Sequence, residues 1–395
     1  MSAPRLYISA GIAAALFGPA IARSDPPTAK SWPMFRGGPQ LTGVAASELP
    51  DKPALLWKFN AGDSVASSAA IDGGVVYVGC ENGNLYALNL ANGSIRWQTQ
   101  TAPTTQTSST QPSRPAIQSS PTVHKDLILF GDMDGFMHAV AKSDGKEKWT
   151  YHAGGEVISS ANCWEDRVLF GSYDGSLYCV SDKDGKEIWK YETEGKVHAT
   201  PGIWLDSKHV AHAIIAGCDA HMRIIRISDG RQVSAVEIGG YCGASPAIVE
   251  NRAYVGNFSN QVCGVDLTAA KLLWTYEDSE RQFPYLSSAA VAPGHVVLGG
   301  RDKVIHCLDP MSGKTQWAFT TRGRVDSSPV INGNRVWAAS SDGNLYSLDL
   351  VSGKELWRYE VASPMSASPA IADGRLVIGT EDGAIFCFGA AEARK

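Results

Sequence analysis

A short motif recurs along this chain at a nearly constant interval. It reads DGKEKW from Asp144, DGKEIW from Asp184, SGKTQW from Ser312 and SGKELW from Ser352. A Ser/Ala-Ser-Pro/Ala step recurs with it and marks the start of each unit. The second positions of this step are Ser68, Ser120, Ser160, Thr200, Ser245, Ser288, Ser328 and Ser368. Self-similarity with a period of about 40 residues indicates a repeat architecture, and it limits the fold more than any single residue does.

Each unit has the pattern of four short β-strands. The Ser step leads into an apolar run such as VVYVG or RLVIG, and an Asn-Gly or Asp-Gly pair follows. An alternating run such as LYALNL comes next, and the tryptophan motif ends the unit. Because Asn-Gly and Asp-Gly accept positive φ angles, they predict two-residue hairpin turns. Four antiparallel strands repeated at this period predict an all-β protein, a β-propeller of four-stranded blades.

The two ends of the repeat array complement each other. The eighth unit ends after AIFCFG without a fourth strand, whereas Trp57 in ALLWKFNAG stands ahead of the first complete unit. We therefore expect an eight-bladed ring closed by an N-terminal strand that joins the C-terminal blade, which removes the exposed sheet edges. The tryptophans expected to dock blade against blade are Trp57, Trp97, Trp149, Trp189, Trp274, Trp317 and Trp357. The motif fails at Ser234 in unit four and at Ala270 in unit five.

The first residues have the features of a secretory signal. Arg5 precedes an apolar run, Leu6–Phe17, and small residues before Ala22 suit cleavage after that residue. The prediction is a signal peptide at 1–22 and export to the periplasm or the cell exterior. The apolar run is too short to span a bilayer comfortably, no later run is long enough, and no lipid-anchoring cysteine follows it.

The remaining chain divides into a leader and one domain. We place a leader segment at 23–52 and a single propeller at 53–395. A polar stretch, 101–115, lengthens the connection between units one and two, and its Thr/Ser/Gln/Pro composition predicts a flexible insertion. The net charge of −5 and the lack of Lys/Arg clusters argue against a nucleic-acid partner.

The cysteines show a positional pattern. Four of them, Cys179, Cys263, Cys307 and Cys387, occupy one register of the repeat, where other units have Ala or Ser. We interpret these four as small hydrophobic residues of separate blades, which could not pair with one another. Pairing among Cys80, Cys163, Cys218 and Cys242 stays open.

These motifs together resemble a known repeat family. The Gly-Lys-x-x-Trp motif, the Ser-Ser-Pro step and the DGxLYALD pattern are similar to the pyrroloquinoline-quinone-like (PQQ-like) propeller repeat, from Ala54 to Gly389. The leader segment Ser31–Gly43 resembles the one that precedes such propellers in exported bacterial proteins. The eight units and the length are similar to the BamB family of outer-membrane assembly propellers, although the lipobox cysteine of that family is absent. This resemblance implies a non-catalytic scaffold with binding loops.

The resemblance also raises the question of a cofactor. Quinoprotein dehydrogenases share the repeat but carry adjacent cysteines, a calcium site and a catalytic aspartate, and this chain has no Cys-Cys pair. We therefore predict no cofactor and no catalytic residue, with PQQ binding kept as an alternative. In unit four, His212, Cys218 and His221 could converge on zinc or copper. We favour the interpretation that they are ordinary polar residues of a hairpin, and we predict no metal.

The propeller geometry gives the candidate binding site. The innermost strands line a central channel, so residues just before the Ser-Ser-Pro step should surround one mouth of it. The candidates at this funnel rim are Gln118, Lys196, His198, Tyr241, Arg281, Tyr285, Arg322, Arg324 and Asp326. Such a rim suits an anionic or peptide ligand.

The leading hypothesis is an exported, non-catalytic monomer that binds a protein or another component of the cell envelope. The alternatives are a PQQ-dependent oxidoreductase or cofactor-binding relative, and a carbohydrate- or peptide-binding module of the envelope.

Overall fold

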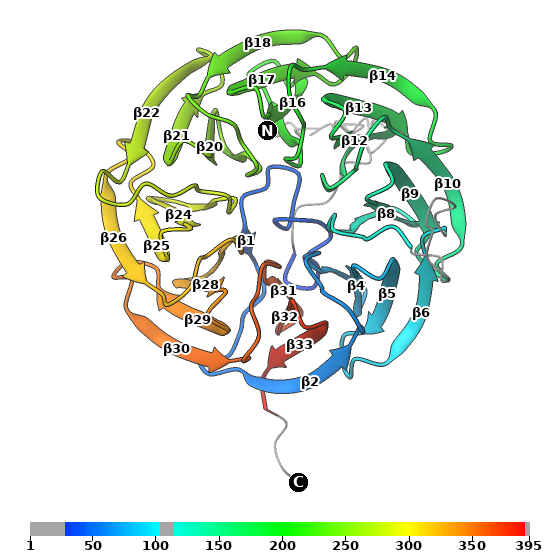
Figure 1. Ribbon diagram of the computed structural model, residues 1–395, viewed down its shortest axis with the longest axis vertical. Coiled ribbons are helices and arrows are strands. Elements are labelled where there is room, and N and C mark those ends of the chain that lie inside the picture. The colour runs from blue at the N-terminus through cyan, green and yellow to red at the C-terminus, as the bar shows by residue number, and fades with distance from the viewer. Residues whose placement is uncertain (1–27, 103–113, 392–395) are drawn as a thin grey trace, which may run out of the picture.

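The computed structural model describes residues 28–102 and 114–391. That part of the chain contains strands and no helix, arranged as eight sheets around a central axis (Figure 1). The predicted all-β, eight-bladed propeller is confirmed. The predicted signal peptide and the middle of the predicted insertion lie outside the described residues.

The strands follow one another blade by blade. Blades 1 and 2 consist of β3 (Ala70–Asp72), β4 (Val75–Gly79), β5 (Asn84–Asn89), β6 (Ile95–Gln100), and of β7 (Thr122–His124), β8 (Leu127–Gly131), β9 (Phe136–Ala141), β10 (Glu147–His152). Blades 3 and 4 consist of β11 (Asn162–Trp164), β12 (Arg167–Gly171), β13 (Ser176–Ser181), β14 (Glu187–Glu192), and of β15 (Gly202–Leu205), β16 (Ala211–Ala216), β17 (His221–Arg226), β18 (Gln232–Glu237). Blades 5 and 6 consist of β19 (Ala247–Val249), β20 (Arg252–Gly256), β21 (Gln261–Asp266), β22 (Lys271–Glu277), and of β23 (Ala290–Ala292), β24 (His295–Gly299), β25 (Val304–Leu308), β26 (Thr315–Thr320). Blades 7 and 8 consist of β27 (Val330–Asn332), β28 (Arg335–Ala339), β29 (Asn344–Asp349), β30 (Glu355–Glu360), and of β31 (Ala370–Ala372), β32 (Arg375–Gly379), β33 (Ala384–Gly389), β2 (Ala54–Asn60).

The N-terminal strand closes the ring. β2 pairs antiparallel with β33, with Trp57 opposite Cys387, and so supplies the outermost strand of blade 8 (Figure 1). The predicted closure is therefore confirmed. Because the ring is closed, every blade has a neighbour on both sides.

The hairpin turns differ from the prediction in one respect. In blade 1 the Cys80 N–H donates to Asn84 O at 2.9 Å and the Gly83 N–H donates to Cys80 O at 3.0 Å, which makes a three-residue loop. The predicted two-residue turn is wrong. Within this loop only Gly83 has a positive φ, 78°, and the Asn82 side chain accepts the Asn84 N–H at 3.1 Å. Glycine takes the left-handed position because it has no Cβ.

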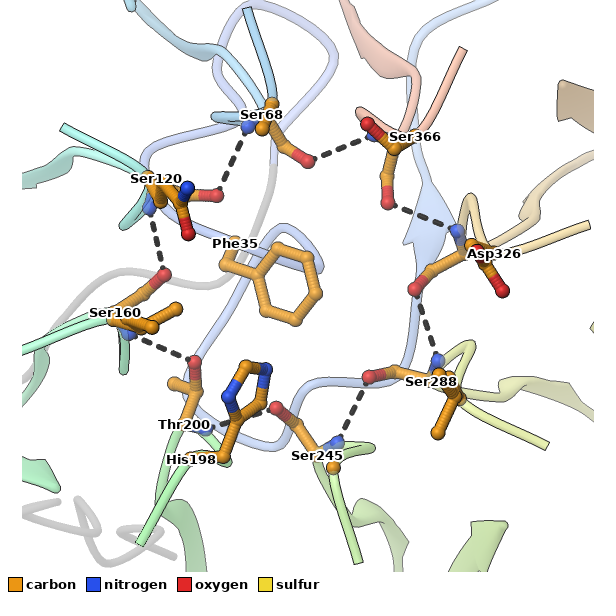
Figure 2. Close-up of a pocket in the computed structure, with 17 residues that line it drawn as sticks. Phe35, Ser68, Ser120, Ser160, His198, Thr200, Ser245, Ser288, Asp326 and Ser366 are labelled. Atoms are coloured by element: carbon orange, nitrogen blue, oxygen red, sulfur yellow. Dashed lines mark hydrogen bonds between the residues drawn. The ribbon is translucent and has the colours of Figure 1, made fainter. Parts of the chain in front are cut away.

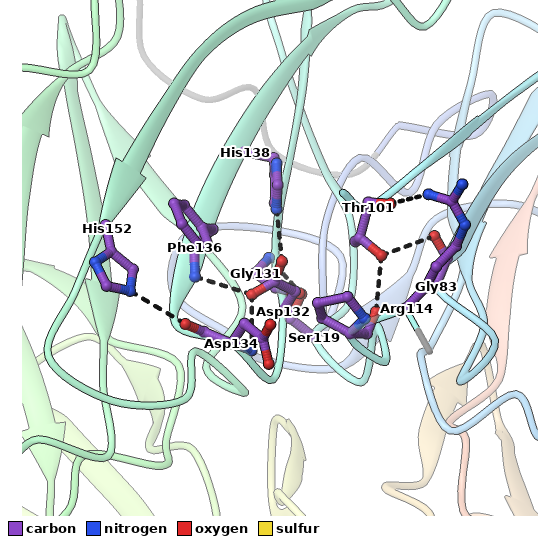
Figure 3. Close-up of polar contacts among 11 residues, drawn as sticks. Gly83, Thr101, Arg114, Ser119, Gly131, Asp132, Asp134, Phe136, His138 and His152 are labelled. Atoms are coloured by element: carbon purple, nitrogen blue, oxygen red, sulfur yellow. Dashed lines mark hydrogen bonds and ion pairs between the residues drawn. The ribbon is translucent and has the colours of Figure 1, made fainter. Parts of the chain in front are cut away.

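The two positions of the Ser-Ser step have different roles. In blade 2 the first hydroxyl, Ser119 Oγ, accepts the Gly131 N–H at 2.7 Å and donates to Gly131 O, which ties the innermost strand to its neighbour (Figure 3). The second hydroxyl, Ser120 Oγ, accepts the Ser68 N–H of the preceding blade at 3.1 Å. The same bond links Ser68, Ser120, Ser160, Thr200, Ser245, Ser288, Ser328 and Ser368 in turn. Ser368 N–H closes the circle on Ser68 Oγ at 2.9 Å, and we call the circle the hydroxyl ring.

The tryptophans sit between blades. The Trp149 indole N–H donates to Asp182 O of blade 3 at 2.9 Å, and a Cβ placed on Gly185 would lie 2.6 Å from its ring. The same bond to a turn carbonyl of the next blade is made by Trp57, Trp97, Trp189, Trp274 and Trp317. Trp357 instead meets Phe388 of blade 8 edge to face, with ring centroids 6.0 Å apart.

The two positions that depart from the repeated motif, Ser234 and Ala270, lie at the same interface between blades. In six of the other interfaces the tryptophan of one blade lies on the turn glycine of the next. By the same geometry, the absent tryptophan at Ser234 and the absent glycine at Ala270 belong to the single interface between blades 4 and 5. Ala270 keeps the left-handed turn conformation, with φ at 47°. Another tryptophan spans this interface, since Trp204 Nε1 donates to Asn251 Oδ1 at 3.2 Å.

The leader fills the central channel (Figure 1). Trp32 and Ile71 exchange backbone hydrogen bonds of 2.7 and 2.8 Å. Leader carbonyls accept further N–H groups of the innermost strands in the pairs Val123–Pro33, Ile203–Pro39, Ile248–Gln40, Val291–Thr42 and Ile331–Gly43. β1 (Val44–Ala45) then adds to β27 as a parallel strand. The leader thus covers strand edges that would otherwise be unpaired.

The four cysteines of the common register are buried in hydrophobic clusters between blades. Cys179 and Cys307 stand opposite Trp189 and Trp317 of the neighbouring strand. Burial raises the pKa of Cys179 and of Cys307 to about 12, which keeps both thiols protonated.

Candidate functional site

A cavity of about 150 Å³ lies on the channel axis. It opens at the end of the propeller formed by the loops that enter the innermost strands and by the turns between second and third strands, which we call the mouth face. The hydroxyl ring encircles Phe35 of the leader, and both line the cavity (Figure 2). Each blade adds one wall residue two positions before its ring residue. The wall residues are Ala66, Gln118, Ile158, His198, Gly243, Leu286, Asp326 and Ser366.

Three of the predicted rim residues lie on this wall. Gln118 donates from Nε2 to Glu81 Oε1 at 3.1 Å. His198 projects toward the axis (Figure 2). Its Nδ1 lies 2.7 Å from the Tyr173 hydroxyl. Burial lowers the pKa of His198, so its imidazole is neutral at neutral pH.

Asp326, the third, is held between two arginines. Its carboxylate oxygens lie 2.9 Å from Arg301 Nε and 3.0 Å from Arg324 Nε. The three side chains together leave one positive charge at the edge of the cavity. Sequence reasoning missed Arg301, because only loops before the Ser-Ser-Pro step were considered and Arg301 lies in the turn between β24 and β25.

The other predicted residues are spread over the mouth face or lie beneath it. The Lys196 ammonium stands 4.2 Å from the centre of the Tyr173 ring, and Arg281 and Arg322 are exposed on their loops. Tyr285 is fully buried, with its ring 5.3 Å from that of His306, and it does not face the cavity. Spacing from the Ser step could not show this, because adjacent loop residues point to opposite sides.

An aromatic patch on the mouth face contains the predicted rim residue Tyr241 together with Phe258 and Phe283, which were not predicted. Tyr241, Phe258 and Phe283 are 60%, 44% and 49% exposed on the loops of blades 4 to 6. The Phe258 N–H donates to Tyr241 O at 2.8 Å, so the first two are held side by side. The available signal was Phe258 itself, an aromatic residue at a turn position where blade 7 has Ser341.

A polar cluster in blade 2 is structural. His138 Nε2 lies 2.8 Å from Asp132 Oδ2, and Asp132 Oδ1 accepts the backbone N–H of Phe136 at 2.9 Å (Figure 3). Nearby, Arg114 donates to Thr101 O, so the two ends of the predicted insertion are joined (Figure 3). These bonds fix loops and present no group to a ligand.

The three residues considered for a metal do not converge. His212 is buried with its ring 5.2 Å from that of Trp204, while His221 Nδ1 lies 2.7 Å from Asp219 O. Cys218 Sγ points to Cys242 O at 3.7 Å. Within residues 28–102 and 114–391, no group of three or more His, Cys, Asp or Glu side chains is placed to hold a metal ion.

The channel mouth does not fit a quinone cofactor. Phe35 stands on the axis, and the space beside it is about 150 Å³, whereas cofactor pockets usually measure about 300–1,000 Å³. The leader that carries Phe35 is bonded to the innermost strands, so it is part of the wall. No chemical step is therefore assigned to PQQ in this propeller.

Comparison with known proteins places the chain in a family. The family model described as outer membrane protein assembly factor BamB matches residues 54–130, 106–240 and 301–395, which is more than half of the chain. The protein belongs to the BamB family. Outer membrane protein assembly factor BamB of Yersinia pestis is 20% identical over 268 residues, 64% of this chain. The match spans only 54% of the Yersinia protein's own length.

Solved structures share the fold of this BamB-family propeller. BamB from Moraxella catarrhalis superimposes with a TM-score of 0.70 at 16% identity, over 87% of this chain and 99% of that one. Quinohemoprotein alcohol dehydrogenase from Comamonas testosteroni gives a TM-score of 0.75 at 12% identity, over 95% and 82% of the two chains. The described residues hold no helix that is long and apolar enough to cross a membrane.

Proposed function

We propose that this BamB-family propeller is an exported, non-catalytic module that binds a protein of the cell envelope through its mouth face. The observation that carries the proposal is the aromatic patch of Tyr241, Phe258 and Phe283. Arg301 and Arg324, with side chains 38% and 52% exposed, lie on the same face. Exposed Tyr, Phe and Arg side chains gathered in one place are typical of protein-binding surfaces.

Two further observations support this function. The family is named for outer membrane protein assembly, and the apolar run Leu6–Phe17 has the length and composition typical of a secretory signal. The leader occupies most of the channel and leaves a cavity of about 150 Å³ at its mouth, so the mouth face is the surface left for recognition. A quinone-dependent activity has no such support, because Phe35 occupies the place where a cofactor would enter the funnel.

A crosslinking pull-down from envelope extract tests the proposal. The test variant carries Tyr241→Ser and Phe258→Ser. The matched control carries Met311→Ser and Val351→Ser, since these residues are 62% and 70% exposed on turns at the opposite face. The wild type and the control should enrich the same envelope protein and the test variant should lose it. Equal enrichment by all three proteins would exclude the mouth face as the binding surface.

A further inference from the structure

The hydroxyl ring holds hydrogen-bond donors that the protein does not use. Each of its eight hydroxyls accepts one backbone N–H from the preceding blade. Throughout the described residues, none of these hydroxyls donates to a protein acceptor. A Ser or Thr hydroxyl carries one donor proton, so the ring presents eight O–H groups along the cavity. These groups suit a ligand with acceptor oxygens.

A buried cation, Arg36, lies next to Phe35, which lines the same cavity. Arg36 is fully buried, and its guanidinium donates to Pro329 O, Ala289 O and Ser328 O at 2.6, 3.1 and 3.2 Å. Its guanidinium carbon is 6.0 Å from the centre of the Phe35 ring. Burial alone lowers the pKa of Arg36 to about 9, and in the part of the chain that the structure describes no carboxylate pairs with it. A buried charge without a counterion is unfavourable, so an anion close by would stabilise it.

We propose that the axial cavity binds the free C-terminal carboxylate of the partner's chain. Ring hydroxyls would donate to the carboxylate oxygens, while Phe35 offers an apolar floor to the terminal side chain. This inference rests on the proposed function, because it names the part of the partner that the mouth face recognises.

The cavity borders the aromatic patch at the wall residue Gly243, so one chain can reach both. A Cβ on the wall residue Gly243 would lie 3.3 Å from Phe258 and 3.7 Å from Leu286. A chain that ends in the cavity and leaves it past Gly243 would contact Phe258. Capture of a chain terminus by convergent donors is a known mode of peptide recognition.

Calorimetric titration of the full chain tests the inference with defined probes. The probes are the tripeptide acetyl-Ala-Ala-Phe with a free carboxylate, its C-terminal amide, and inorganic phosphate. The free acid should bind at least tenfold more tightly than the amide, which is the loss expected when a hydrogen bond to a charged group is removed. Equal affinity for acid and amide would overturn the inference. Binding of phosphate without binding of the free acid would overturn it too, since the site would then serve a free anion.

Two paired variants locate the effect in the ring. Ser245→Ala with Ser288→Ala removes two donors, whereas Ser245→Thr with Ser288→Thr keeps them, as the natural Thr200 already does in the same ring. The Ala pair should lose the preference for the free acid and the Thr pair should keep it, with thermal melting as the check on folding. The acid-to-amide comparison on the wild type stands even if the Ala pair does not fold. If patch variants lose the envelope partner while the Ala pair keeps it, the proposed function holds and the carboxylate site is refuted.

Discussion

The interface between blades 4 and 5 can be rebuilt with two substitutions. In the neighbouring interfaces a Cβ on the turn glycine would approach the tryptophan ring to 2.5–2.7 Å, so Ser234→Trp alone should collide with the Cβ of Ala270. Ala270→Gly alone should stabilise the fold by about 1 kcal/mol, since a left-handed conformation costs a non-glycine residue about 1–2 kcal/mol. Together they should let the new indole pack on the turn and donate to Leu267 O, the carbonyl at the position used in the other blades.

The magnitude follows from the area that the indole buries. A tryptophan buries about 150–250 Å², worth about 4–6 kcal/mol as an upper bound. We expect the double variant to exceed the sum of the single variants by at least about 2 kcal/mol. With an unfolding entropy of about 0.7 kcal/mol/K for about 350 residues, this coupling raises Tm by about 3 °C. Differential scanning calorimetry of the four proteins measures it. Single effects that add within about 0.5 kcal/mol would refute the pairing of these two positions.

Three other predictions concern single residues. Gly185→Ala should lower Tm in thermal melts much more than Gly294→Ala does. Both glycines have a positive φ, but a Cβ at Gly185 would collide with Trp149, whereas a Cβ at Gly294 would meet nothing within 4 Å. Equal losses of Tm would contradict this. Ser368→Ala should lower stability by about 1–3 kcal/mol in the same melts by leaving the Ser328 N–H without its acceptor, and Ser368→Thr should restore it. Burial lowers the pKa of His198, so on acidification the imidazole is protonated in the unfolded chain before it is protonated in the folded one. The contribution of His198 to stability should therefore be complete above pH about 6.5 and decrease toward pH 5. His198→Gln should flatten a plot of Tm against pH, and an unchanged slope would contradict the assignment.

The fold could be predicted because every blade repeats the same local information. Turn glycines, the Ser-Ser step and tryptophans recur in register, so the count of eight and the closure through Trp57 followed from arithmetic. The position of the leader could not be predicted, because its partners are strand edges that exist only after the ring has formed. For the same reason Phe35 and Arg36 gave no signal as parts of a site.

The candidate site was predicted in part. Gln118, His198 and Asp326 line the cavity because their distance from the Ser step is fixed by a short, regular connection into the innermost strand. Tyr285 has a similar distance but is buried, since adjacent loop residues alternate between the cavity and the space between blades. Arg301 and Phe258 belong to turns far from the Ser step in sequence, and only the folded ring brings them to the mouth face.

The leader segment bonds to blades that are synthesised after it. Ala29 precedes every blade in the sequence, yet its carbonyl accepts the N–H of Asp373 in blade 8 at 2.7 Å. Until the last blade has been synthesised, Trp32, Met34 and Leu41, all buried in the finished ring, have no complete site. A truncated chain would therefore leave an apolar segment open to proteases. Seating of the leader therefore requires the closed ring, so the leader stays unprotected until blade 8 has been synthesised.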